Sequence, residues 1–115
     1  MHELALSEQI VQTALRACGE RSAGMTAIAV QVGALSSVSP PALEFCLRTV
    51  LDSHGLQQTQ ARISYVPARV RCRCGHEYQT EDMFAPCPQC GDYQREILEG
   101  RDIIIQHVEV EDGED

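Results

Sequence analysis

Four of the chain's six cysteines are clustered in a short stretch of sequence, and this cluster constrains the possible fold more than any other feature. They are Cys72, Cys74, Cys87 and Cys90. The second pair encloses two residues and precedes Gly91, a spacing with which two thiolates bind one ion while glycine permits the tight turn. The first pair encloses only one residue, and it can still chelate through a different turn. The spacing therefore predicts a tetrahedral Zn(II) site with four thiolate ligands.

A zinc ion held by four protein ligands has no open position for a substrate, so the predicted site is structural rather than catalytic. Folding of the surrounding residues, 68–95, should then require the ion. His76 follows Cys74 by two residues and offers a substitute ligand if the geometry at Cys72 is poor. Disulfides and a cysteine-lined core are weaker explanations, because a cytoplasmic chain keeps its thiols reduced and this stretch holds little that could form a core.

The charge of the chain restricts its partners and its location. A formal net charge of -8 at pH 7 disfavours nucleic acid, whose binding depends on neutralising phosphates, and it equally disfavours an anionic membrane surface. The first ten residues lack the basic segment of a signal peptide, and no apolar run approaches the length of a membrane span. We therefore expect a cytoplasmic protein with neither a nucleic acid nor a membrane as its partner.

Apolar periodicity predicts the elements outside the cysteine cluster. Helices are expected over 4–18 and 39–54, and strands over 26–35, 61–67 and 101–111. Ser39 and the two prolines after it suit a helix N-terminus, because proline there gives up only an N–H group that has no partner. The order of elements indicates an α+β domain. Its small sheet of about three strands is packed by two helices, and a zinc-ribbon-like module is inserted before the last strand.

The sequence shows no signature of an enzyme. It contains no recognisable arrangement of nucleophile, base and orienting residue, and no glycine-rich loop for phosphate. Cys18 and Cys46 fall at core positions of the two expected helices, where free cysteines behave as small apolar residues. We therefore predict a metal-binding protein without catalytic activity.

The opening Met-His-Glu-Leu is unexplained by the zinc module, but together with other segments it resembles the HypA family of hydrogenase maturation factors, which are nickel metallochaperones. Those segments are VQVGALSSVSPPALEF, the paired cysteine knuckles and the closing IIIQHVEVE. The resemblance covers nearly the full length of the chain. It implies that Ni(II) binds at Met1, His2 and Glu3, and that the zinc module acts as a sensor that communicates with the nickel site.

The chemistry of the first three residues supports this implication. The α-amine of Met1, the deprotonated amide nitrogens of His2 and Glu3, and the His2 imidazole can form fused chelate rings around one ion. Nitrogen ligands in a square plane suit Ni(II) and Cu(II) far better than Zn(II). For Glu3 we expect the backbone rather than the carboxylate to be the ligand.

The resemblance also implies partners and a division of the chain. Residues 1–67 would form the first part of a nickel-binding domain, 68–95 the zinc-binding module, and 96–115 the returning strand and an acidic tail. The protein would deliver nickel, as cargo, with a HypB-like GTPase to the [NiFe]-hydrogenase large subunit precursor. Some members of the family also serve urease maturation.

One departure from the family concerns the first cysteine pair, which usually has two intervening residues. This departure puts the identity of the first zinc ligand in question, between Cys72 and His76. The alternative function is a zinc-ribbon adaptor that binds a protein partner without delivering nickel. Such an adaptor would bind its partner equally well without His2.

Overall fold

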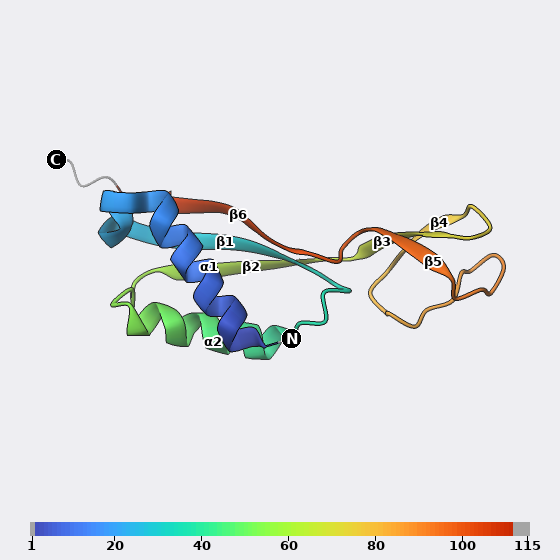
Figure 1. Ribbon diagram of the computed structural model, residues 1–115, viewed down its shortest axis with the longest axis horizontal. Coiled ribbons are helices and arrows are strands. Elements are labelled where there is room, and N and C mark those ends of the chain that lie inside the picture. Colours follow the sequence, from blue (N-terminus) through green and yellow to red (C-terminus); the bar gives the residue numbers. More distant parts are fainter. Residues whose placement is uncertain (1, 112–115) are drawn as a thin grey trace. The chain divides into compact units, whose positions relative to one another are not determined.

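The computed structural model describes residues 2–111 and consists of two compact units (Figure 1). Within the described residues, the first unit comprises 2–30, 38–64 and 105–111, and the second comprises 31–37 and 65–104. Each unit is therefore built from separate stretches of sequence. The expected division at residues 67 and 95 concerns metal-binding roles, and it stays a prediction.

Two helices form one layer of the first unit. Helix α1 spans Glu3–Cys18 and α2 spans Pro40–Ser53, within a residue or two of the expected ranges. Their buried apolar side chains recur at three- and four-residue intervals, so each helix has one apolar face. These side chains are Ile10, Val11 and Ala14 on α1, and Leu43, Leu47, Val50 and Leu51 on α2. The two helices pack against one another.

A three-stranded sheet forms the second layer of this unit. Its order is β2-β1-β6, with β1 (Met25–Gly33) between β2 (Gln60–Val66) and β6 (Ile103–Val110). The last strand thus returns to the sheet of the first, which confirms the predicted α+β fold with an inserted module. Because β1 is central, it is buried along almost its whole length. The segment Gly19–Gly24 is a 3₁₀ helix (η1) that connects α1 to β1.

The second unit contains a three-stranded sheet that the sequence pattern did not predict. Strand β3 (Ala68–Cys72) lies between β4 (Glu77–Thr80) and β5 (Arg95–Glu99), and both pairings are antiparallel. On β3, Ala68, Val70 and Cys72 are buried and the two intervening arginines are exposed. This alternation is the normal signature of a half-buried strand. Leu35 joins Ala68 and Val70 in a small buried apolar cluster, with Tyr78 and Ile97 partly buried against it.

The segment 33–35 belongs to the second unit because its backbone is bonded there. The N–H groups of Gly33 and Leu35 donate to the carbonyl oxygens of Asp102 and Gly100, at 3.0 and 2.9 Å. A Cβ on Gly33 would lie 2.2 Å from the Gly100 carbonyl oxygen, so no larger residue fits at this crossing. Gly100 also has φ +95°, a conformation that L residues rarely adopt. The crossing therefore depends on both glycines.

Within residues 2–111, no helix combines the length and the apolar character needed to cross a membrane.

A buried hydroxyl on α1 provides a first testable prediction. Ser7 is fully buried, and its Oγ has no hydrogen-bond partner. Because a buried polar atom without a partner costs roughly 1–3 kcal/mol, and alanine is the better helix former, Ser7→Ala should raise the free energy of unfolding by about 1–2 kcal/mol. Denaturant unfolding measures this change. The control is Thr13→Ala at an exposed position of the same helix, where only the gain in helix propensity of at most ~0.7 kcal/mol is expected. A loss of stability in Ser7→Ala would contradict the prediction.

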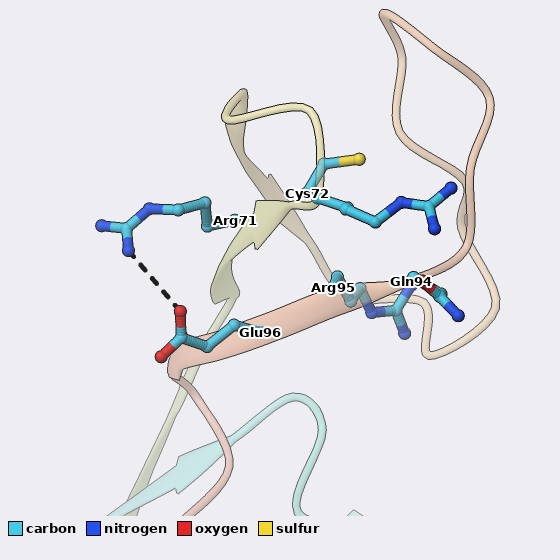
Figure 2. A pocket seen from close by; sticks show the side chains of 6 residues that line it. Arg71, Cys72, Gln94, Arg95 and Glu96 are labelled. Atoms are coloured by element: carbon cyan, nitrogen blue, oxygen red, sulfur yellow. Dashed lines mark ion pairs between the residues drawn. The ribbon is translucent and has the colours of Figure 1, made fainter.

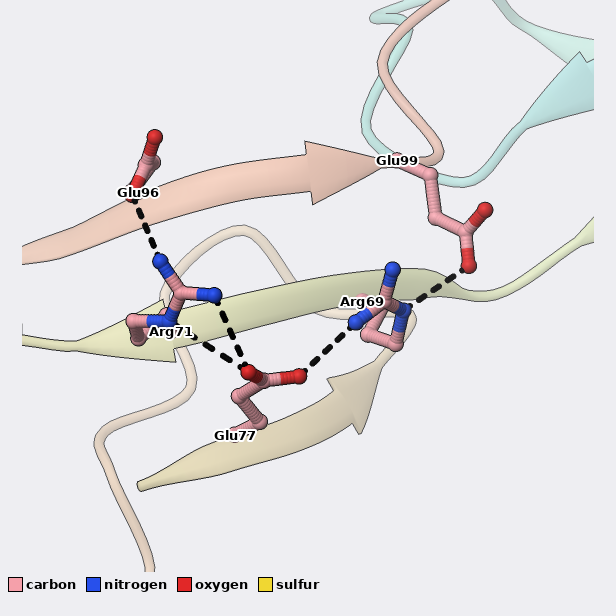
Figure 3. A network of polar contacts seen from close by, with 5 residues as sticks. All are labelled: Arg69, Arg71, Glu77, Glu96 and Glu99. Carbon is pink, nitrogen blue, oxygen red and sulfur yellow. Dashed lines mark hydrogen bonds and ion pairs between the residues drawn. The ribbon is translucent and has the colours of Figure 1, made fainter. Parts of the chain in front are cut away.

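A chain of ion pairs crosses the exposed face of the second unit's sheet (Figure 3). Glu77 on β4 lies between two arginines of β3, with its carboxylate oxygens 2.7 Å from Arg69 Nη1 and 3.1 Å from Arg71 Nη2. On the other side of β3, Arg69 contacts Glu99 at 3.0 Å and Arg71 contacts Glu96 at 3.5 Å. Hydrogen bonds from Arg71 and Arg69 hold the pKa of Glu77 below its usual range. The network therefore joins all three strands through side chains.

Glu77→Gln should weaken this network and lower the melting temperature by no more than a few degrees, since each pair is exposed to solvent. The difference from wild type should shrink as salt rises from 0.01 to 1 M, because the Debye length falls from about 30 to about 3 Å. Thermal unfolding at several salt concentrations measures both effects. Glu81→Gln is the matched control, because it makes the same charge change at an exposed position outside the network. A difference independent of salt would mean that Glu77 acts through packing.

Candidate metal centre

Two tight turns bring the four clustered cysteines together. In the first turn, the Gly75 N–H donates to the Cys72 carbonyl at 2.8 Å, and in the second the Gly91 N–H donates to the Cys87 carbonyl at 2.9 Å. Both glycines have positive φ, at +95° and +75°, which explains why glycine follows each pair. The first turn closes with one residue between its cysteines. The short spacing is therefore compatible with a knuckle.

The sulfur positions fit a tetrahedral ion. The Sγ atoms of Cys72 and Cys90 are 3.4 Å apart, those of Cys74 and Cys87 are 3.8 Å apart, and all four lie within 4.8 Å of one another. A zinc–sulfur bond of about 2.3 Å requires tetrahedral sulfur atoms to lie about 3.8 Å apart. The described residues 2–111 contain no other cluster of three or more potential metal ligands. The donor set and spacing therefore suggest zinc binding.

The thiols differ in their readiness to ionise. Burial opposes ionisation of Cys87, but the backbone N–H groups of Cys90 and Gln89 donate toward its sulfur, and the neighbouring thiols assist, so that its pKa falls to about 7. A hydrogen bond from the Cys74 backbone favours the thiolate form of Cys72. Burial and hydrogen bonds with the other three thiols have the opposite effect and are stronger, so the pKa of Cys72 rises to about 12. Four thiolates so close together repel one another, and a cation is what allows them to coexist.

His76 lies outside this cluster. Its ring stacks on Tyr78, with the ring centroids 6.0 Å apart and the planes at 13°. Cys72 is 2% exposed at the end of β3, where its N–H donates to the His76 carbonyl at 2.8 Å. The structure thus groups Cys72, and not His76, with the other three sulfurs. Which of the two binds zinc stays a prediction.

An arginine-rich hollow of about 340 Å³ borders the cluster on the side of β3 and β5 (Figure 2). It is lined by Arg71, Cys72, Arg73, Gln94, Arg95 and Glu96. Each arginine has a partner: Arg71 pairs with Glu96, Arg73 Nη2 lies 2.7 Å from Asp92, and Arg95 donates to the Ala85 carbonyl at 2.7 Å. Zinc with four thiolates would carry roughly two negative charges in excess, and nearby guanidinium groups offset such a charge.

The first described residues form the start of α1. His2 is exposed and is the N-cap residue, and its carbonyl accepts the first helical hydrogen bond, from Leu6, at 3.1 Å. The Glu3 carboxylate accepts a hydrogen bond from the Ser39 N–H at 2.9 Å, which holds its pKa below the usual range. Met1 lies outside the described residues.

The remaining histidines, His54 and His107, lie outside the stretch of sequence that holds the four clustered cysteines. His54 is the C-cap residue of α2, and His107 on β6 contacts Glu109 at 3.1 Å. Both are exposed. Neither joins a cluster of three or more potential ligands among residues 2–111.

The two-layer fold and the four-cysteine cluster are those of a small α+β protein with a candidate metal centre. Comparison with known proteins gives the family: residues 1–110 match the family described as "Hydrogenase/urease nickel incorporation, metallochaperone, hypA". The chain belongs to the HypA family. Its members are metallochaperone maturation factors, not enzymes.

Two relatives and one solved structure illustrate the match. A hydrogenase maturation factor HypA from Geobacter metallireducens is 32% identical over 112 residues, covering 96% of this chain and all of the relative. One from Chlorobium luteolum is also 32% identical, over 99% of this chain and 100% of the relative. The solution structure of the Ni metallochaperone HypA from Helicobacter pylori superposes with a TM-score of 0.66 at 15% identity. It covers 96% of this chain and 97% of that one, and it supports the fold alone.

Proposed function

We propose that this protein binds Ni(II) through Met1, His2 and Glu3 and delivers it to the [NiFe]-hydrogenase large subunit precursor. The ligands would be the Met1 α-amine, the backbone amides of His2 and Glu3, and the His2 imidazole. A HypB-like GTPase would assist delivery in the cytoplasm, and urease maturation proteins are further candidate partners. The family description, nickel incorporation for hydrogenase and urease, supports this assignment.

The observation that carries the proposal is the position of His2 and Glu3 at the very start of α1. The first four N–H groups of a helix have no intrahelical acceptor. Nickel can therefore replace the amide protons of these two residues without breaking a helical hydrogen bond. The His2 side chain makes no capping hydrogen bond, so its imidazole is available as a ligand.

Zinc would be held by Cys72, Cys74, Cys87 and Cys90, and when bound it would stabilise the four thiolates as a structural ion. The chain's own contribution is the pair of tight turns, which place the four sulfurs within 4.8 Å of one another. The buried core of this unit is small, so the ion would supply stability that packing cannot. On this proposal residues 68–95 are the zinc-binding module, and 1–67 with 96–115 form the nickel-binding domain.

Maturation in cells tests the delivery step. A bacterium that makes [NiFe]-hydrogenase but has lost its own HypA-family gene should recover hydrogenase activity at low nickel when this chain and a HypB-like GTPase are supplied. His2→Ala should fail at low nickel and recover when nickel is added in excess, because excess metal replaces targeted delivery. Equal activity of His2→Ala and wild type at low nickel would favour the adaptor that binds a protein partner without carrying nickel.

A further inference from the structure

We propose that the Glu3 carboxylate is a positioning group for the nickel-binding terminus rather than a nickel ligand. It holds the first turn of α1 against the start of α2 through the Ser39 N–H. This inference rests on the proposed function, since it concerns the same three residues. It deepens that function by giving the side chain of Glu3 a role distinct from that of its backbone.

The contact is specific because the N-terminus of α2 offers few donors. Pro40 and Pro41 occupy the first positions of the helix and have no N–H group. The Ser39 N–H is the donor directly before them, and it lies 2.9 Å from Glu3 Oε2. The Ser39 hydroxyl makes no capping hydrogen bond, so the carboxylate of Glu3 supplies a capping acceptor from another helix. The positive end of the α2 dipole favours the negative charge there.

The contact restrains the part of the chain that the chelate needs in a fixed shape. Helix ends fray, and His2 provides no side-chain cap for α1. Glu3 is the first residue of α1 and follows His2 directly, so anchoring its side chain limits the motion of the backbone on both sides of its amide nitrogen. A ligand set that is ordered before the metal arrives loses less conformational entropy on binding, which raises affinity.

The same geometry argues against the carboxylate as a ligand. Ligation of nickel by Glu3 Oε2 would compete for the oxygen that accepts from Ser39. It would also leave the N-terminus of α2 without this acceptor, in a helix whose next two residues have no N–H. The nitrogen ligands of Met1, His2 and Glu3 already suffice for a square plane around Ni(II).

Four variants of the full chain test the proposal, with nickel affinity measured by competition against a chelator and geometry by visible absorption. Glu3→Ala removes the acceptor, and Ser39→Pro removes the donor at a position whose φ of -78° suits proline. Both should weaken nickel binding by on the order of tenfold, because each deletes the same charge-assisted hydrogen bond. Glu3→Gln keeps an acceptor and Ser39→Ala keeps the N–H, so both should stay within about threefold of wild type.

The position of the square-planar absorption band should be the same in all four variants, because none of them removes a ligand. Glu3→Ala combined with Ser39→Pro should cost no more affinity than either change alone, since the two residues act through one contact. Apo-protein circular dichroism confirms that each variant is folded. If Ser39→Pro does not fold, the comparison of Glu3→Gln with Glu3→Ala tests the same hydrogen bond.

Two results would overturn the proposal. A band shifted in Glu3→Gln and Glu3→Ala but unchanged in Ser39→Pro would make the carboxylate a ligand. Equal affinity of Glu3→Ala and wild type would mean that the contact has no effect on nickel. Failure of the proposed function looks different, because nickel binding would then be insensitive to His2→Ala as well.

Discussion

Nickel bound in a square plane should be lost from His2→Ala and from a chain with one residue added before Met1. The substitution removes the imidazole, and the added residue moves the α-amine out of reach of the chelate rings. Each change should lower nickel affinity by on the order of 100-fold or more, because the remaining ligands cannot close the plane. Visible absorption during a nickel titration of untagged protein measures the loss.

Two controls sharpen this experiment. His107→Ala removes an exposed histidine on β6 and should leave both the band and the affinity unchanged. Lowering the pH should release nickel from the wild type, because the amine, the amides and the imidazole bind only when deprotonated. Nickel that remains bound in both altered proteins would have to be held by the cysteines or by other histidines, and the proposal for residues 1–3 would fail.

Cys72→Ala should cost the protein its zinc, whereas His76→Ala should not. Cys72 is buried and lies 3.4 Å, sulfur to sulfur, from Cys90, while the His76 ring stacks on Tyr78. Removal of a direct ligand should reduce zinc affinity by more than the roughly 10–100-fold that supporting residues cost. We expect one zinc ion per wild-type chain by elemental analysis, and weak, chelator-labile zinc in Cys72→Ala.

Loss of zinc should also unfold the second unit, because the apolar cluster of Leu35, Ala68 and Val70 in its core is small. Amide hydrogen exchange on β3, β4 and β5 should accelerate after chelation, while the helices of the first unit keep their protection. Cys46→Ala is the matched control, because this cysteine lies on α2, outside the cluster. Zinc retained by Cys72→Ala and lost from His76→Ala would show that the histidine is the fourth ligand.

The sequence predicted those elements whose formation depends on residues close together in the chain. The prolines at 40 and 41 begin α2, and apolar residues at helical spacing define the buried faces of both helices. The cysteine pairs form two turns that end in glycine, as their spacing indicates. In each case the residues that carry the signal also make the structure, so one sequence suffices to recognise it.

Contacts between residues that are far apart in the sequence could not be predicted from a local pattern. Strands β4 and β5 are only four and five residues long, and both pair with β3. Apolar residues alternate with arginine along Ala68–Cys72, and this alternation indicates a strand. The stretch was instead interpreted as part of the cysteine cluster. Nothing near Leu35 indicates that it completes a core more than thirty residues away, and nothing near Glu3 indicates Ser39.

The strand order β2-β1-β6 has a consequence for folding during protein synthesis. Helices α1 and α2 are synthesised well before β6, but the sheet of the first unit cannot be completed until β6, which ends at Val110, has been translated. The second unit likewise waits for Gly100 and Asp102 before the backbone of Gly33 and Leu35 is paired. The helices of a chain with this topology should therefore gain stable packing only after residues 103–110 have been synthesised, long after the helices themselves.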